Sequence, residues 1–250
     1  MLKILPLLIF FVVAGCAHAP RQEPVISPKE VQSRLELAEN YLVAAEPRSA
    51  LEQLRLIKNQ AGDNPSLYFF LGVAHELLND PERSVQAYEQ AVAIDPSFGE
   101  AWNNLGQVRQ AIGEFEASAE AYKRALALEG YMTPEFAAYN MASLMAKQGR
   151  LDEALAYSRL GMEKNRRYIP LYQQSSDLLR RTGRMEEAVE VLESGVLARP
   201  DNPDLKIMLA EELIRAGRER DARKWFLRVM EQEPESDAAR TAAGYMEVIR

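Results

Sequence analysis

Apolar and polar positions beyond residue 30 recur on two length scales. Over short distances, large apolar residues return every three or four positions, as Tyr68 and Leu71 do, which is the spacing of one face of an α-helix. Over long distances the same residue types return every 34 positions, as Gly149, Gly183 and Gly217 do. A fixed period of this length predicts a stack of similar helical units.

Residues 65–98 show the repeating unit in its fullest form. In order, this unit holds Tyr68, Leu71, Gly72, Ser84, Tyr88, Ala91 and Pro96, and residues 99–132 repeat the order with Trp102, Leu105, Gly106, Gly113, Ser118, Tyr122 and Ala125. Further units are predicted at 31–64, 135–168, 169–202 and 203–236, so six units fill the region 30–236. Each unit is expected to be a helix pair with small residues at the crossing, and to bury its apolar stripe only against the next pair.

This order of residues resembles the tetratricopeptide repeat, which asks for a large residue, Leu-Gly, a small residue, an aromatic residue, Ala and a closing Pro. The resemblance implies an all-α fold, a right-handed superhelical solenoid of about six helix pairs. Residues 237–250 have helical propensity but no room for another pair, and they predict a C-terminal capping helix. A two-residue insertion at 131–134 breaks the period once and is expected to shift the superhelix locally.

Turn residues mark the predicted helix ends. Pro47 and Pro81 are expected near the first position of the second helix in their units, where the missing N–H of proline costs nothing. Gly149, Gly183 and Gly217 suit helix C-caps.

The N-terminus predicts export and lipid attachment. Residues 1–15 have one early cation, Lys3, followed by an apolar run too short to span a bilayer, which is typical of a signal peptide. The segment Val13 to Cys16 then resembles a bacterial lipobox, in which the thiol is lipidated and cleavage leaves the cysteine as the first residue. A buried cysteine and an ordinary cleavage site are the alternatives, and a retained membrane helix is the weaker interpretation of the apolar run.

Residues 16–29 predict a tether, because Pro20, Pro24 and Pro28 favour an extended chain. Several acyl chains on Cys16 would hold the protein durably on a membrane. In lipoproteins of this kind, Ala17 after the cysteine implies the outer membrane, with the chain facing the periplasm. The repeats must then be stable through packing, since Cys16 is the only cysteine and no disulfide can form.

Charge and chemistry exclude several functions. The formal net charge of −7 becomes −8 when Lys3 leaves with the signal peptide, and no basic stripe with interleaved aromatic residues appears, so nucleic acid is not an expected partner. His18 falls in the tether and His75 at a packed repeat position. Paired carboxylates such as Glu211-Glu212 are interpreted as solvated helix faces. No nucleophile with a base, metal-ligand spacing or phosphate-binding loop is present, so we expect no enzyme activity, no cofactor and no metal.

The expected site is a concave groove formed by the first helix of each pair. Positions 2, 5, 9, 12 and 13 of each unit line this groove in tetratricopeptide proteins, and the register carries that role onto Phe69, Val73, Glu76, Asn103, Gln107, Tyr139, Ser143, Lys147, Gln173, Asp177, Arg180, Arg181, Ile207, Glu211 and Arg215. The groove would be apolar at first, rich in amides in the middle and charged further on. Phe69 and Val73 suit insertion of a partner's side chains, although Phe69 packing on the next repeat is an equal alternative. The Lys-Asn clamp of chaperone-binding relatives is absent.

The whole arrangement of lipobox, tether, six repeats and phase break resembles the type IV pilus biogenesis lipoproteins, the pilotins of the PilW/PilF/Tgl type. The most specific element is the stretch from Tyr131 through Pro134-Glu135 to Tyr139-Asn140. The resemblance implies a scaffold that binds secretin subunits in its groove and assists their localisation or assembly in the outer membrane. The alternative is an adaptor for another envelope machine, such as outer-membrane protein insertion, peptidoglycan enzymes or polysaccharide export.

Overall fold

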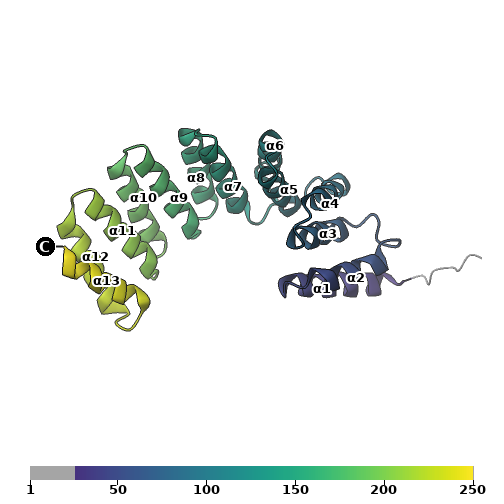
Figure 1. Cartoon of the computed structure of the whole chain (residues 1–250), viewed down its shortest axis with the longest axis horizontal. Helices are drawn as coiled ribbons and strands as arrows, with labels where there is room; N and C mark the ends of the chain where they lie inside the picture. The colour runs from purple at the N-terminus through teal and green to yellow at the C-terminus, as the bar shows by residue number, and fades with distance from the viewer. Residues whose placement is uncertain (1–25, 250) are drawn as a thin grey trace, which may run out of the picture.

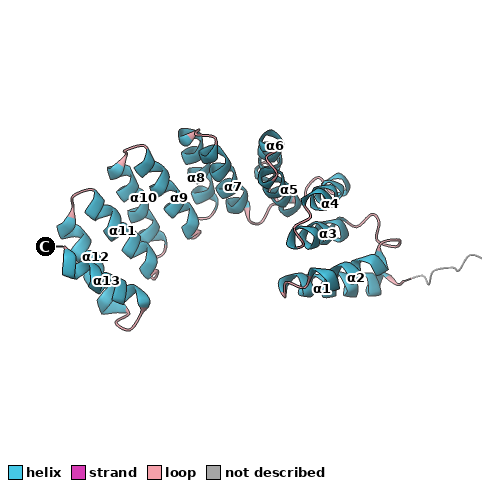
Figure 2. Cartoon of the chain, in the orientation of Figure 1, coloured by secondary structure: helices cyan, strands magenta, loops and turns pink. Residues whose placement is uncertain are grey.

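The computed structural model describes residues 26–249, and every regular element in that range is an α-helix (Figure 2). The helices are α1 (Pro28–Val43), α2 (Pro47–Ile57), α3 (Pro65–Leu77), α4 (Pro81–Ile94), α5 (Gly99–Ala111), α6 (Phe115–Leu126), α7 (Pro134–Lys147), α8 (Leu151–Lys164), α9 (Ile169–Arg181), α10 (Met185–Ala198), α11 (Pro203–Arg215), α12 (Glu219–Gln232) and α13 (Asp237–Val248). Six pairs and one closing helix confirm the predicted fold class. The signal peptide, Cys16 and most of the tether lie outside the described residues.

The pairs succeed one another along an arch, with α1 and α2 at one end and α12 and α13 at the other (Figure 1). Apart from isolated contacts, each helix touches only helices one or two places away in the chain. Stability in such a stack comes from each pair and from the interfaces between neighbouring pairs. The first helices of the pairs, α1 to α11 in odd numbers, follow one another along this arch, and we call them the layer of first helices.

Prolines and polar caps set where helices begin. Pro47 and Pro81 are the first residues of α2 and α4, as expected. Helix α1 begins earlier than the unit boundary, because the Ser27 hydroxyl accepts a hydrogen bond from the Glu30 N–H at 3.2 Å and Pro28 follows this cap. The final residues assigned to the tether, at 28 and 29, are therefore helical.

The second residue after the end of each of these first helices has a left-handed backbone. Gly149, Gly183 and Gly217 have φ angles of 77°, 74° and 75°, which confirms their capping role. Ala45 and Asn79 hold the same place in the first two repeats, with φ angles of 57° and 56°. The turn is thus fixed by the repeat geometry, even where its residue is not glycine.

Close helix crossings form the core of the second and third repeats. A Cβ atom on Gly72 would lie 2.5 Å from the Tyr88 ring, so only glycine lets these two helices approach. The Ser84 hydroxyl donates to the Gly72 carbonyl at 2.9 Å across the same crossing. Tyr88 and its counterpart Tyr122 are fully buried. The expected placing of small residues at crossings and bulky residues between them is confirmed here.

The phase break has a packing role. Residues 127–133 separate α6 from α7, whereas only 95–98 separate α4 from α5; the longer loop leads into α7 in Figure 1. Tyr131 within the longer loop is only 6% exposed and covers Gly99, where a Cβ would lie 2.5 Å from the Tyr131 ring. The inserted residues therefore seal the start of α5.

Candidate functional site: a groove along the first helices

Three open hollows lie along the layer of first helices. One of about 280 Å³ lies between α3 and α5, one of about 330 Å³ between α7 and α9, and one of about 230 Å³ between α9 and α11. The predicted residues that line them are Glu76, Gln107, Tyr139, Ser143, Gln173, Asp177, Arg180, Arg181, Glu211 and Arg215. These hollows define the groove.

Five predicted groove residues line none of these hollows. Asn103 and Ile207 are buried, with 7% and 8% of their surface exposed, so they support the groove wall from within. Phe69 and Val73 are half-buried and pack on the core of repeats two and three. Lys147 is exposed at the end of α7.

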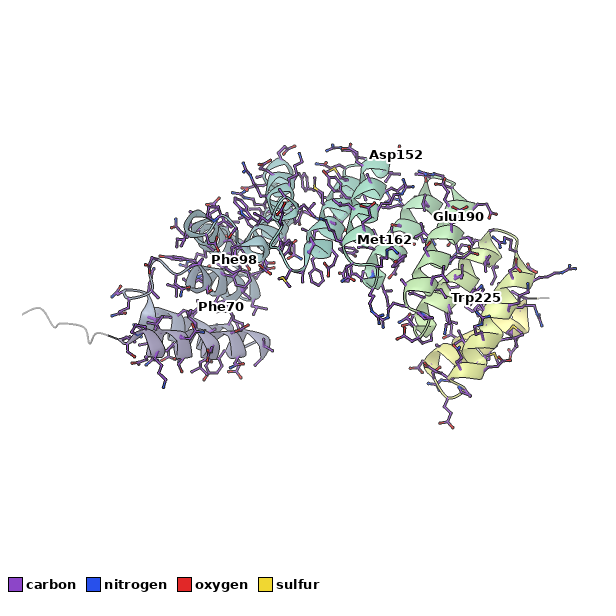
Figure 3. All side chains as sticks on the ribbon, turned by 180° about the vertical axis from the view of Figure 1, so that it is seen from behind. Phe70, Phe98, Asp152, Met162, Glu190 and Trp225 are labelled. Atoms are coloured by element: carbon purple, nitrogen blue, oxygen red, sulfur yellow. The ribbon has the colours of Figure 1, made fainter. Side chains whose placement is uncertain are left out.

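Phe69 packs on aromatic residues of its own repeat and on the core that this repeat shares with the next one. Its ring centroid lies 4.9 Å from that of Phe98, the residue that precedes α5, and 5.8 Å from that of Tyr88. Phe70 is also within 5.7 Å of the Phe69 centroid (Phe70 and Phe98 are labelled in Figure 3). These contacts favour the packing alternative for Phe69 and leave less apolar surface in this part of the groove.

A hydrogen-bonded ladder crosses repeats two to four. The Tyr88 hydroxyl donates to the Glu76 carboxylate at 3.0 Å and accepts from the Asn104 amide at 3.3 Å. The Asn103 amide donates to Asn104 at 3.3 Å, and the Asn140 amide donates to Asn103 at 3.0 Å. Partial burial raises the pKa of the Glu76 carboxyl, and the bond from Tyr88 opposes this rise. Asparagine side chains of the middle groove thus form hydrogen bonds between neighbouring repeats.

Gln174 extends the polar contacts from α7 to α9. Its amide donates to the Ser143 hydroxyl at 2.8 Å and to the Tyr139 carbonyl at 3.1 Å, while its own oxygen accepts from Ser158 at 2.9 Å. Tyr139 and Ser143 are therefore held in place at the edge of the hollow between these helices.

A buried carboxylate organises the charged part of the groove. Glu212 is only 1% exposed, and its Oε2 lies 2.9 Å from Arg215 and 3.6 Å from Arg180. Arg180 also pairs with Asp177 at 2.5 Å, and Glu211 accepts from the Tyr245 hydroxyl of α13 at 2.8 Å. No donor reaches Oε1 of Glu212. The charged groups are therefore a connected network.

The prediction that Glu211-Glu212 forms a solvated pair is wrong for Glu212. Its place in α11 is the place that Leu144 and Leu178 hold in α7 and α9, which faces the core. A carboxylate at an apolar repeat position was the available signal, because a buried charge requires partners. Aligning the repeats position by position would have found it.

Within residues 26–249, no group of His, Cys, Asp and Glu side chains could hold a metal ion. None of the helices α1 to α13 is long and apolar enough to cross a bilayer.

Stacked helix pairs with a lined groove define a class of protein, the helical-repeat scaffold that binds protein partners. Two family models, both described as tetratricopeptide repeat, match this chain, one at residues 35–98 and 99–160 and the other at residues 179–244. The chain belongs to the tetratricopeptide repeat family, whose members are typically interaction scaffolds.

Known proteins agree with this assignment. The TPR repeat-containing protein PA0015 of Pseudomonas aeruginosa is 31% identical over 77 residues, which are 31% of this chain and 73% of that protein. The structure of PilW, described as a widely conserved type IV pilus biogenesis factor, aligns with 87% of this chain and 100% of its own at a TM-score of 0.64 and 18% identity. The structure of Pseudomonas aeruginosa PilF aligns with 87% of this chain and 98% of its own, at a TM-score of 0.67 and 15% identity. The chain spans only 19% of a yeast relative, small glutamine-rich tetratricopeptide repeat-containing protein 2, which is 36% identical over 67 residues, or 27% of this chain.

Proposed function

We propose that this chain is an outer-membrane-anchored scaffold that binds secretin subunits and assists their localisation or assembly in type IV pilus biogenesis. The observation that carries the proposal is the extent of the structural similarity, since the arch aligns with nearly the whole of PilW and PilF, pilus biogenesis proteins, rather than with a single repeat pair. At 18% and 15% identity that likeness establishes the fold, and the assignment to the pilus is an inference from it.

The groove supplies recognition in this proposal. Its hollows run from α3 to α11, which suits an extended partner segment that contacts several repeats. Tyr139 and Gln107 line two different hollows and are accessible from solvent. A secretin subunit would be held there while the acyl chains on Cys16 keep the complex at the membrane.

The test is complementation of a strain that lacks the gene. Secretin multimers in outer-membrane fractions are measured by immunoblot after expression of the wild-type chain, the Cys16→Ser variant, or no chain. We expect multimers with the wild type, few without the chain, and mislocalised secretin with Cys16→Ser. Normal multimers in the deletion strain would contradict the pilus assignment.

A pull-down from solubilised envelope then locates the contact. Gln107→Ala with Tyr139→Ala is compared with a control double variant, Asp152→Ala with Glu190→Ala, whose residues lie on the outer side of the arch (Figure 3). Loss of secretin with the first variant and retention with the second supports the groove. Capture of a cell-wall or export component in place of secretin would favour an adaptor for another envelope machine.

A further inference from the structure

One position of the repeat changes character halfway along the arch. Position 13, at the end of each first helix, forms a series that we call the terminal row: Val43, Leu77, Ala111, Lys147, Arg181 and Arg215. All six residues are exposed. The first three are apolar and the last three are cationic.

The terminal row borders the groove. Ala111 lines the hollow between α3 and α5, Arg181 lines that between α7 and α9, and Arg215 lines that between α9 and α11. Position 13 follows position 9 by one helical turn, so its side chain lies beside that of the predicted groove residue. A segment that occupies the groove would therefore pass along the row.

Two of the three cations are free to bind a partner. Arg215 pairs with Glu212 at 2.9 Å and with Glu211 at 3.7 Å. Lys147 and Arg181 form no ion pair within residues 26–249, and Asp177 near Arg181 is paired with Arg180. Uncompensated cations along the terminal row of a chain with a net charge of −7, one lining the groove and one beside it, favour an acidic ligand.

The apolar half of the terminal row and the positions next to it carry exposed apolar side chains, beside the hollow between α3 and α5. Leu77 is 48% exposed, and Leu78 and Ile112, one position further along in their repeats, are 37% and 41% exposed. Large apolar residues gathered at equivalent positions of successive repeats provide a surface on which apolar side chains of a partner can be buried.

We propose that the groove binds a protein segment in which an apolar stretch is joined to an acidic stretch. The apolar stretch lies over the first three repeats, and the acidic stretch lies beside Lys147 and Arg181. This inference deepens the proposed function and rests on it only for the idea that a protein partner occupies the groove. The cations that would contact the acidic stretch lie at position 13 of their repeats. This mode of binding differs from a clamp on a chain terminus, because the bound segment extends over successive repeats.

The test begins with selection of phage-displayed random dodecapeptides on the full chain purified in detergent. We expect the enriched peptides to carry an apolar run next to a run of Asp or Glu. Enrichment of peptides without acidic residues, or no enrichment over the empty matrix, would overturn the proposal.

Binding of the most enriched peptide, made with a fluorescent label, is then measured by anisotropy. Lys147→Glu with Arg181→Glu should weaken binding about tenfold and remove most of its dependence on salt. The control Lys123→Glu with Arg220→Glu makes the same change in net charge at exposed positions of α6 and α12, and it should change the affinity less than about twofold. Equal weakening by both double variants would show a nonspecific charge effect and sink the proposal.

Another double variant tests the contact with the apolar stretch of the peptide. Leu77→Ser with Ile112→Ser should weaken binding about tenfold while leaving the dependence on salt intact. Circular dichroism of every variant checks that the repeats remain folded. These measurements do not use secretin, so they test the proposed ligand separately from the pilus assignment. Either proposal can be contradicted while the other holds.

Discussion

The hydroxyl of Tyr88 donates a hydrogen bond to the carboxylate of Glu76 at 3.0 Å, and so connects the core of the second repeat to the groove. The ring of Tyr88 is fully buried against Gly72, while Glu76 lines the hollow between α3 and α5. A single side chain thus sets both the helix crossing and the position of a groove carboxylate. Changes in the core are therefore expected to alter the groove.

Removal of this hydroxyl should change the titration of Glu76. Partial burial raises the pKa of Glu76, and the Tyr88 bond lowers it in part, so Tyr88→Phe should raise the pKa further. Carbon-detected NMR titration of the Glu76 carboxyl measures the change. A pKa below the ordinary value in the wild type, or a fall in Tyr88→Phe, would contradict the geometry.

The same pKa direction predicts how stability depends on pH. Because the folded-state pKa of Glu76 lies above the unfolded one, ionisation of this group opposes folding fully above the folded pKa and not at all below the unfolded pKa. Glu76→Gln should therefore be more stable than the wild type at neutral pH, with the difference closing as the pH falls through the folded pKa. Urea denaturation at several pH values measures this difference, and a constant difference would contradict the prediction.

The helix crossing of the third repeat should leave no room for a side chain at Gly106. A Cβ on Gly106 would lie 2.6 Å from the buried Tyr122 ring, so Gly106→Ala should lower the free energy of unfolding by about 1–3 kcal/mol. Gly130→Ala is the matched control, because nothing lies within 4 Å of that position. Equal thermal shifts for the two variants would show that the crossing is not tight.

Much of the fold follows from the sequence because one interaction repeats. Gly72 with Tyr88 and Gly106 with Tyr122 are the same contact 34 residues apart, so a spacing in the sequence reports a contact in space. A helix pair that must stack on a copy of itself leaves few other arrangements open. The six pairs and the closing helix were predictable for this reason.

Contacts between different repeats were less predictable. The bonds from Asn140 to Asn103 and from Asn104 to Tyr88 depend on how two pairs are rotated against each other, and this rotation is not encoded in the period. Asn103, which was expected to face a partner, therefore joins two repeats. Glu212 shows the converse, because its unusual repeat position was visible in the sequence and its partners were not.

The left-handed turn after α1 should be improved by glycine. Ala45 has a φ angle of 57°, where a Cβ costs about 1–2 kcal/mol, whereas the equivalent turns after α7, α9 and α11 use glycine. Glycine also loses more chain entropy on folding, so Ala45→Gly should raise the free energy of unfolding by a net of about 0.5–1 kcal/mol. Gly149→Ala is the converse and should lower it by about 1 kcal/mol. Destabilisation by both substitutions in chemical denaturation would contradict this account.

We expect that Glu212 serves the groove by placing its arginine partners, and that it does not stabilise the fold. Its Oε1 is buried without a donor, and its two arginine partners, Arg180 and Arg215, remain 36% and 40% exposed, so water can solvate them when the carboxylate is lost. Replacement by the leucine that α7 and α9 carry at this place should therefore raise the free energy of unfolding by about 1 kcal/mol. Glu212→Ala leaves a cavity and should be less stable than Glu212→Leu by about 2 kcal/mol or more. If Glu212→Leu is instead strongly destabilised in urea, the carboxylate holds the last two repeats together; if it is stable but binds the selected acidic peptide with altered affinity, Glu212 acts by placing Arg180 and Arg215 in the groove.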